Sequence, residues 1–174
     1  MFRGSGPGWR GSSHSSNPAR INFAGQTVLH FHGTFDHTLD AKGRLTVPAR
    51  FRSALADGLV LVRPVDLKPC VAIWRKDEYA AYCDAALKEK SPLSKARSDL
   101  ERFFYGNSME TDLDAAGRVM MPANLAEQVS LGRDVVVVGA GSRLEIWSRD
   151  VWNDHQSALH ESVSEVTADA DRAA

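Results

Sequence analysis

The sequence contains an internal repeat, which constrains its fold more than any other feature. Residues 31–49 align without a gap on residues 105–123, at a constant offset of 74. The alignment pairs identical strings, which are Leu-Asp-Ala at 39 and 113, Gly-Arg at 43 and 117, and Pro-Ala at 48 and 122. The match resumes at Ile73-Trp74 and Ile146-Trp147 with an offset of 73, as a single deletion would produce. We therefore predict two copies of one folding unit, over residues 31–80 and 105–153.

Both copies show the same order of local signals. In the first copy, apolar residues alternate on either side of the turn at 40–44, where glycine supplies the positive φ that a tight turn needs. Pro48 then ends the second strand and starts a short helix over 49–56, and two more strands follow at 59–62 and 71–74. The second copy repeats these elements within 109–121, 123–129, 135–138 and 143–147, and we interpret Gly139-Ala140-Gly141 as a hairpin turn.

The segment 81–104 between the copies is predicted to form linker helices. Apolar side chains recur at helical spacing around this segment. They are Tyr79, Tyr82, Cys83, Ala86 and Leu87 for the first helix, and Leu93, Ala96, Leu100, Phe103 and Phe104 for the second.

Both ends of the chain are predicted to lack fixed structure. Residues 1–29 contain repeated Gly and Ser, three Arg and no acid, which is typical of a disordered arm. A misassigned start and a targeting segment are the alternatives. Residues 160–174 are predicted to form an acidic tail, frayed from Ser164 onward.

Charge is distributed unevenly along the 174 residues, although the net charge is only −1. Residues 1–63 carry eight Lys and Arg against three acids, whereas residues 145–174 carry two against seven. This asymmetry suggests a surface that faces a polyanion, and solubility patterning is the alternative. The longest apolar run, 135–138, is too short for a membrane span, and Cys70 and Cys83 are too few for a disulfide framework. We therefore expect a cytoplasmic protein with reduced thiols.

The doubled turn closely resembles the MraZ family. The resemblance rests on residues 33–52, GTFDHTLDAKGRLTVPARFR, and on Asp-Ala-Ala-Gly-Arg at 114–118, and it extends to about residue 155. It implies an α+β fold, a double-split β-barrel of the SpoVT-AbrB type built from two ββαββ repeats. It also implies a bacterial transcriptional regulator that forms a homo-oligomeric ring, associates with the nucleoid and binds double-stranded DNA at repeated sites upstream of the division and cell-wall gene cluster. Residues 1–29 precede the usual start of family members.

The repeated motif places an Arg four residues after an Asp, across a turn that contains glycine. The carboxylate can accept hydrogen bonds from the guanidinium and from turn amides, and so fix the Arg head outward. A fixed Arg presents a donor fork that matches guanine O6 and N7, whereas a less constrained Lys suits phosphate. We predict DNA contacts from Lys42, Arg44, Arg50, Arg52 and Arg118, oriented by Asp40, Gly43, Asp114 and Gly117. The alternative is that each Asp–Arg pair only stabilises its own turn.

The two copies differ in charge around this motif. Residues 36–52 carry a net charge of +2, and the matching residues 110–126 carry −2. The difference includes three cations of the first copy, whose counterparts are Ala116, Asn124 and Ala126. Because phosphate attraction grows with local positive charge, we expect the first copy to make most of the DNA contact and the second to serve folding and subunit packing.

No catalytic, metal or cofactor site is predicted. His30, His32 and His37 have no Cys or acid at ligand spacing, and the chain has no phosphate-binding glycine motif. Trp74 and Trp147 occupy equivalent strand ends, and we expect both to pack in the core. The main alternative function is an antitoxin-like interaction module, in which the acidic tail would bind a basic toxin.

Overall fold

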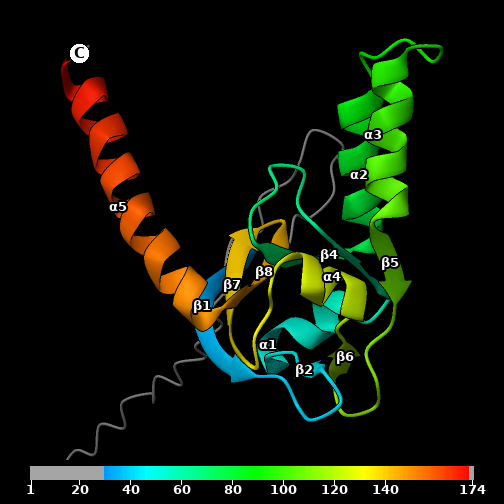
Figure 1. The fold of residues 1–174 in the computed structure, drawn as a ribbon, viewed down its shortest axis with the longest axis vertical. Helices are drawn as coiled ribbons and strands as arrows, with labels where there is room; N and C mark the ends of the chain where they lie inside the picture. The colour runs from blue at the N-terminus through cyan, green and yellow to red at the C-terminus, as the bar shows by residue number, and fades with distance from the viewer. Residues whose placement is uncertain (1–29, 173–174) are drawn as a thin grey trace, which may run out of the picture.

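The computed structural model describes residues 30–172 and shows an α+β protein (Figure 1). The elements of the first copy are β1 (Phe31–Thr38), β2 (Arg44–Thr46), α1 (Ala49–Arg52), the 3₁₀ helix η1 (Ser53–Leu55), β3 (Leu59–Val62) and β4 (Cys70–Arg75). Two helices follow, α2 (Lys76–Leu87) and α3 (Lys95–Gly106). The second copy and the C-terminal helix are β5 (Ser108–Thr111), β6 (Arg118–Met120), α4 (Ala123–Gln128), β7 (Asp134–Gly141), β8 (Arg143–Ser148) and α5 (Arg149–Arg172). The predicted strand–turn–strand–helix–strand–strand order is therefore confirmed in both copies.

The two copies exchange strands instead of folding side by side. Six antiparallel strands form one sheet in the order β1-β7-β8-β4-β3-β5, and β2 pairs with β6 in a second, two-stranded sheet. The first strand of each copy thus pairs with the third strand of the other. The strands that flank each turn do not form a hairpin ladder, and in the first copy only the bridge between Leu39 and Leu45 joins them. Among the described strands, β1 and β5 are open edges, so this sheet does not close on itself.

The main core lies between the large sheet and the layer made by β2, β6, α1 and α4. Equivalent residues of the two copies fill it, as Leu45 and Val119 do from the paired short strands, where each is at most 1% exposed. Phe51 of α1 and its counterpart Leu125 of α4 are buried in the same cluster. Burial of each such side chain contributes about 1.5–3 kcal/mol. The core therefore holds the two exchanged copies together as one body.

Helices cover the other face of the sheet differently in its two halves. The α2–α3 hairpin packs on β3 and β4 around Trp74, and the Tyr79 hydroxyl donates to the Phe104 carbonyl at 2.9 Å. Burial raises the pKa of Tyr79, so this hydroxyl stays protonated. On the other half, α5 packs alone on β7 and β8 through Trp152, whose ring centroid lies 5.6 Å from that of Trp147. The predicted burial of Trp74 and Trp147 is confirmed.

Three sequence predictions need correction. Leu93 lies in the loop between α2 and α3 and is 97% exposed, so it does not belong to a helical face. Gly139 lies inside β7 opposite Gly33, and the positive-φ glycine at the end of β7 is Gly141. The segment from Ser164 does not fray at once, because α5 is helical to Arg172, and its sequence contains neither Gly nor Pro to stop it. The predicted N-terminal arm lies outside the described residues.

Candidate nucleic-acid interface

The turn at residues 40–44 is organised by one carboxylate. Asp40 Oδ1 accepts hydrogen bonds from the main-chain N–H groups of Lys42 and Arg44, at 2.9 and 3.0 Å. Asp40 Oδ2 accepts a hydrogen bond from Nε of the Arg44 guanidinium and forms an ion pair with its Nη2, both at 2.7 Å. Gly43 closes the turn with a φ of +74°, and its N–H donates to the Asp40 carbonyl. The carboxylate therefore fixes both the turn and the Arg head, as predicted.

The second turn repeats this arrangement almost to the tenth of an ångström. Asp114 Oδ1 accepts from the main-chain N–H groups of Ala116 and Arg118, both at 2.9 Å. Asp114 Oδ2 accepts a hydrogen bond from Nε of Arg118 and forms an ion pair with its Nη2, both at 2.8 Å. Gly117 has the same φ of +74°. The two copies thus share the same Asp–Arg hydrogen bonds, although most of the surrounding charges differ.

These contacts keep both carboxyl groups ionised. The main-chain N–H of Arg44 is the largest cause that lowers the pKa of Asp40. For Asp114 the largest cause of the lowered pKa is the hydrogen bond from the Arg118 side chain, and the same bond raises the pKa of Arg118. The charge of Asp40 also raises the Arg118 pKa, which places the two turns within electrostatic reach of each other. Each pair therefore stays charged near neutral pH.

The two turns interlock at one end of the molecule. Leu45 of β2 is in register with Val119 of β6. Next to this pairing, the Val47 N–H donates to the Gly117 carbonyl and the Met121 N–H donates to the Gly43 carbonyl, both at 3.0 Å. Figure 1 shows both turns at the end of the body opposite to the α2–α3 hairpin. Strand exchange thus brings together two Asp-held Arg side chains that lie 74 positions apart in the sequence.

Each Arg keeps part of its donor capacity for a ligand. The Nε side of the Arg44 guanidinium is bound to Asp40. The Arg44 side chain is 26% exposed, and the Arg118 side chain is 32% exposed. Within residues 30–172, the outer edge formed by Nη1 and Nη2 has no acceptor other than this carboxylate. Such an edge can donate two parallel hydrogen bonds to an acceptor pair. The geometry is therefore suited to a guanine edge or a phosphate.

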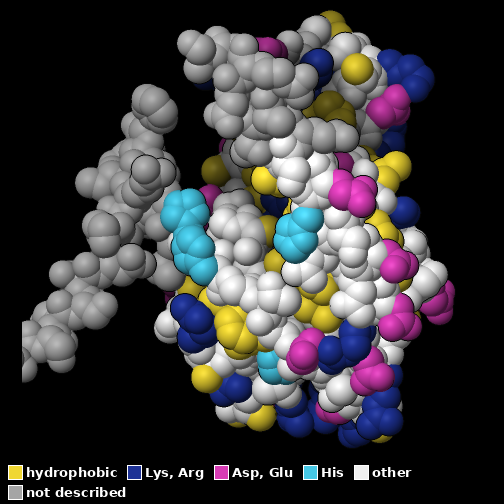
Figure 2. Space-filling view, turned by 90° about the vertical axis from the view of Figure 1, so that its left-hand side faces the viewer, with side chains coloured by type: hydrophobic (Ala, Val, Ile, Leu, Met, Phe, Trp, Pro, Cys, Tyr) yellow, Lys and Arg dark blue, Asp and Glu magenta, His cyan; other side chains and the backbone are white. Residues whose placement is uncertain are grey.

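The remaining predicted cations lie nearby but differ in freedom. Lys42 is exposed, and its ammonium group has no partner in the described part of the chain. The Arg50 guanidinium is exposed above the rings of Phe51 and Phe35, at 5.3 and 5.8 Å from their centroids. Arg52 is half-buried, and its Nε donates to the Val47 carbonyl at 2.9 Å. Figure 2 shows Lys and Arg side chains gathered at this end, with acidic side chains among them.

Charge counting along the sequence overstated the acidity of the second copy at this surface. Glu110 and Asp112 lie with Lys76 at the start of α2, their carboxylate oxygens 3.7 and 4.0 Å from its ammonium nitrogen. In the first copy, Asp36 likewise pairs with a distant residue, Arg149 at the start of α5. Only spatial pairing could show this, because these partners are distant in the sequence. The acids that remain within the turns are Asp40 and Asp114, each already bound to its Arg.

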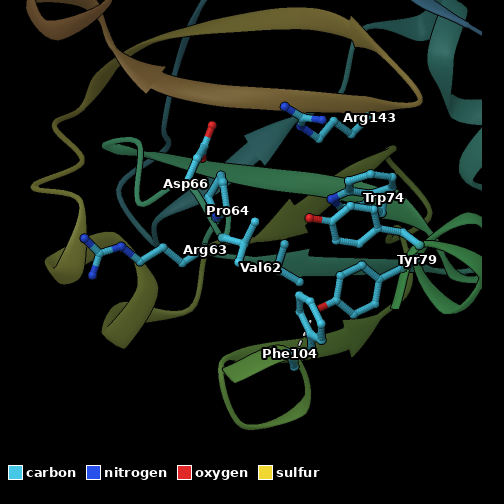
Figure 3. Close-up of a pocket in the computed structure, with 10 residues that line it drawn as sticks. Val62, Arg63, Pro64, Asp66, Trp74, Tyr79, Phe104 and Arg143 are labelled. Carbon is cyan, nitrogen blue, oxygen red and sulfur yellow. Dashed lines mark hydrogen bonds between the residues drawn. The ribbon is translucent and has the colours of Figure 1, made fainter. Parts of the chain in front are cut away.

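A separate recess of about 220 Å³ lies between the β3–β4 loop and the linker helices (Figure 3). Trp74 stacks on Tyr82 with a centroid distance of 5.0 Å, and the Arg143 guanidinium lies 5.5 Å from the centroid of the Trp74 ring. Arg143 is bound in turn to the buried Glu145, while the Arg63 head points away from the aromatic rings in Figure 3. The rings mainly join the hairpin to the sheet.

His32 and His37 lie in β1, and His30 directly precedes it. The rings of His30 and His32 lie 6.0 Å apart, and burial lowers the pKa of His37. Within residues 30–172, no three His, Cys, Asp or Glu side chains come together in a way that could hold a metal ion. Cys70 and Cys83 are both buried as free thiols.

Comparison with known proteins identifies the family. A model described as "MraZ protein, putative antitoxin-like" matches residues 30–102 and 104–173. The chain belongs to the MraZ family. A protein named transcriptional regulator MraZ from Thermoanaerobacter pseudethanolicus is 34% identical over 139 residues, covering 80% of this chain and 95% of the relative. Proteins of the same name from Mycoplasma mycoides and Desulfitobacterium hafniense are 36% and 40% identical, each covering 72% of this chain and covering 92% and 85% of the relatives.

The predicted resemblance to MraZ is therefore confirmed, and these three relatives are named as transcriptional regulators. The two matched segments correspond to the two copies, so the internal repeat is also a family feature. The family match begins at residue 30, which leaves the N-terminal arm outside it. Within residues 30–172, no helix combines the length and the hydrophobicity that crossing a membrane requires.

Proposed function

We propose that this MraZ protein regulates transcription by binding double-stranded DNA through the end that carries its two interlocked turns. The observation that carries the proposal is the duplicated Asp-held Arg, Asp40–Arg44 and Asp114–Arg118, with an outer guanidinium edge left for an acceptor. Because the carboxylate has already ordered each Arg, DNA binding loses less side-chain entropy than it would with free side chains. The neighbouring cations add the sequence-independent attraction that all duplexes share.

The side chains of this surface divide into two groups by freedom. Arg44 and Arg118 are fixed and offer paired donors, which suits the O6 and N7 acceptors of guanine in the major groove. Lys42 in the first turn and Arg50 in α1 are exposed and suit phosphate. In this division the fixed residues give sequence preference, and the exposed residues give affinity that falls as salt increases.

The proposal extends to assembly and to target sites. The predicted DNA contacts of one protomer are only five cations, so tight occupancy needs several protomers on repeated sites. The family resemblance supports a ring of identical subunits, with a double-split barrel in each and target repeats upstream of the division and cell-wall gene cluster. The open edges β1 and β5 and the exposed apolar residues Met109 and Met120 offer surface for such assembly. Association with the nucleoid follows from DNA binding.

The first test is Arg44→Ala, with Lys42→Ala as its matched control on the same turn. A preferred duplex is selected from a random pool, and its affinity and that of a scrambled duplex are measured by fluorescence anisotropy across a salt series. We expect Arg44→Ala to lose about 1–3 kcal/mol on the selected duplex only, and Lys42→Ala to weaken both duplexes and reduce the salt slope by about one. Equal losses of Arg44→Ala on both duplexes would refute base reading, and no enrichment from the pool would refute sequence-specific binding.

The family description also supports a second candidate, an antitoxin-like interaction module. In this function α5 would present its acidic surface to a basic protein, since Glu161 and the apolar Leu159 are both exposed on it. Charge reversal of Glu161 and Asp154 would then abolish partner binding, whereas Arg44→Ala would leave it unchanged. The opposite pattern supports DNA binding.

A further inference from the structure

The two turns have the same internal hydrogen bonds but different surroundings. A methyl group built on Gly43 would have no atom within 4 Å, so the first turn stands open. A methyl group built on Gly117 would overlap the Cδ, Nε and Cζ atoms of Arg52. The side chain of Arg52, which belongs to the first copy, therefore lies directly against the turn of the second copy.

Arg52 also binds the strand that leads away from the first turn. Its Nε donates to the Val47 carbonyl at 2.9 Å, and the Val47 N–H donates to the Gly117 carbonyl at 3.0 Å. The Arg52 side chain thus contacts both Val47 and Gly117, the two residues whose hydrogen bond joins the second turn to the end of β2. The half-burial of Arg52 agrees with this role, because a phosphate-binding side chain would be expected to extend into solvent.

The equivalent support is missing from the first turn. The residue that corresponds to Arg52 in the second copy is Ala126, whose side chain is too short to reach Gly43. Among residues 30–172, the matching hydrogen bond from the Met121 N–H to the Gly43 carbonyl has no guanidinium against its glycine. The similarity of the two turns is therefore broken at this position, at the end of the molecule that is proposed to face DNA.

We infer that Arg52 is a positioning residue, which clamps the turn of Gly117 and thereby holds Arg118, and not one of the phosphate contacts. This inference rests on the proposed function for its consequence in DNA binding, and it replaces the sequence-based role of Arg52. The clamped Arg118 discriminates sharply at its base pair, because it cannot follow a displaced acceptor. The unclamped Arg44 turn adapts to local changes in groove shape and tolerates more sequences.

The clamp itself is tested without DNA, by amide hydrogen exchange of the full chain. Arg52→Ala and Arg52→Lys are expected to accelerate exchange of the Val47 N–H at least fivefold, because neither residue can bridge the Val47 carbonyl and the Gly117 turn in the same way. The Met121 N–H, which occupies the equivalent place, should not change. An unchanged rate at Val47 in both variants overturns the clamp.

The consequence for DNA is tested with the selected duplex and with variants of it changed at one base pair at a time. Arg52→Ala should lower discrimination about tenfold at the base pair that Arg118→Ala also affects, with the salt slope unchanged, and Arg52→Lys should not restore it. A fall in slope of about 0.9 that Arg52→Lys restores would show a phosphate contact and overturn the inference. Failure of the unmodified chain to prefer any duplex would refute the proposed function while leaving the exchange result intact.

A reciprocal variant keeps the inference testable if Arg52→Ala is too unstable to study. Ala126→Arg adds to the second copy the side chain that the first copy has, in front of the open Gly43 turn. Exchange of the Met121 N–H should then slow at least threefold, and discrimination at the base pair assigned to Arg44 should sharpen. Unchanged exchange and discrimination would show that an Arg at this place does not clamp the turn.

Discussion

At the scale of single residues, one carboxylate in each copy performs two tasks. Asp40 accepts hydrogen bonds from two main-chain N–H groups, and these bonds stabilise the turn. It also accepts a hydrogen bond from the Arg44 guanidinium, and this bond fixes the orientation of the side chain. The sequence was sufficient to predict this, because an Asp and an Arg four positions apart across a glycine have few other ways to meet. The role of Arg52 could not be predicted from the sequence. Arg52 lies in the first copy and contacts Gly117 of the second, and no pattern of neighbouring residues indicates a contact between the copies.

The ionised carboxylate predicts a defined pH dependence for Asp40→Asn. Contacts in the folded state lower the pKa of Asp40, so its stabilising effect is complete above the unfolded pKa near 4 and is lost as the pH falls through the lower folded value. The unmodified chain should therefore melt at a higher temperature than Asp40→Asn at pH 7, and the gap should close below about pH 4. Thermal melts from pH 2 to pH 7 measure this. Asp57→Asn, at an exposed acid without an ion pair among the described residues, should show no such gap, and a gap that persists at pH 2 would contradict the assignment.

At the scale of elements, alternation and breakers predicted which segments are strands and helices but not which strands pair. Alternating apolar residues indicate a strand that pairs with another strand, but they do not indicate which one. The pairing of β1 with β7 could therefore not be predicted from the sequence. The predicted turn at Gly139 is wrong for the same reason, because this residue lies inside β7. Its glycine is required by the close approach of the β1 backbone, because a Cβ there would lie 2.5 Å from both His32 N and Phe31 C.

This close approach predicts that Gly139→Ala destabilises the fold. The added methyl group meets main-chain atoms, which cannot move unless β1 and β7 separate, and we expect a loss of about 1–3 kcal/mol. Guanidinium chloride unfolding, followed by circular dichroism, gives the free energy of unfolding. Gly106→Ala is the matched control, since a methyl group there meets no atom within 4 Å at the end of α3, and it should leave stability unchanged or raise it slightly. Equal stability of the two variants would contradict the close packing of β1 on β7.

At the scale of the whole molecule, strand exchange makes the two copies depend on each other. Neither copy alone holds partners for all its strands, because β1 needs β7, β5 needs β3, and β2 needs β6. The order of the large sheet is the same from both ends when equivalent strands are matched, which gives the molecule an internal two-fold pseudo-symmetry. The linker helices α2 and α3 interrupt this symmetry by covering one half of the sheet, while α5 alone covers the other.

The exchange predicts how a fragment that contains only the first copy, residues 30–90, will behave. Its β1 and β3 would lack the partners β7 and β5, and its β2 would lack β6, so a folded monomer would expose the apolar faces of Leu45 and Val47. A second copy of the fragment can supply equivalent strands, because the two-fold pseudo-symmetry would then become exact symmetry. We expect either an unfolded monomer or a folded symmetric dimer. Circular dichroism, and light scattering after size exclusion, distinguish the two.

The variant Leu45→Asp should shift a dimer toward the unfolded monomer, since the Leu45 side chains of both subunits would lie in the same core. A folded, cooperatively melting monomer of this fragment would show that the copies fold independently, and the exchanged pairing would then not be what holds the two turns together.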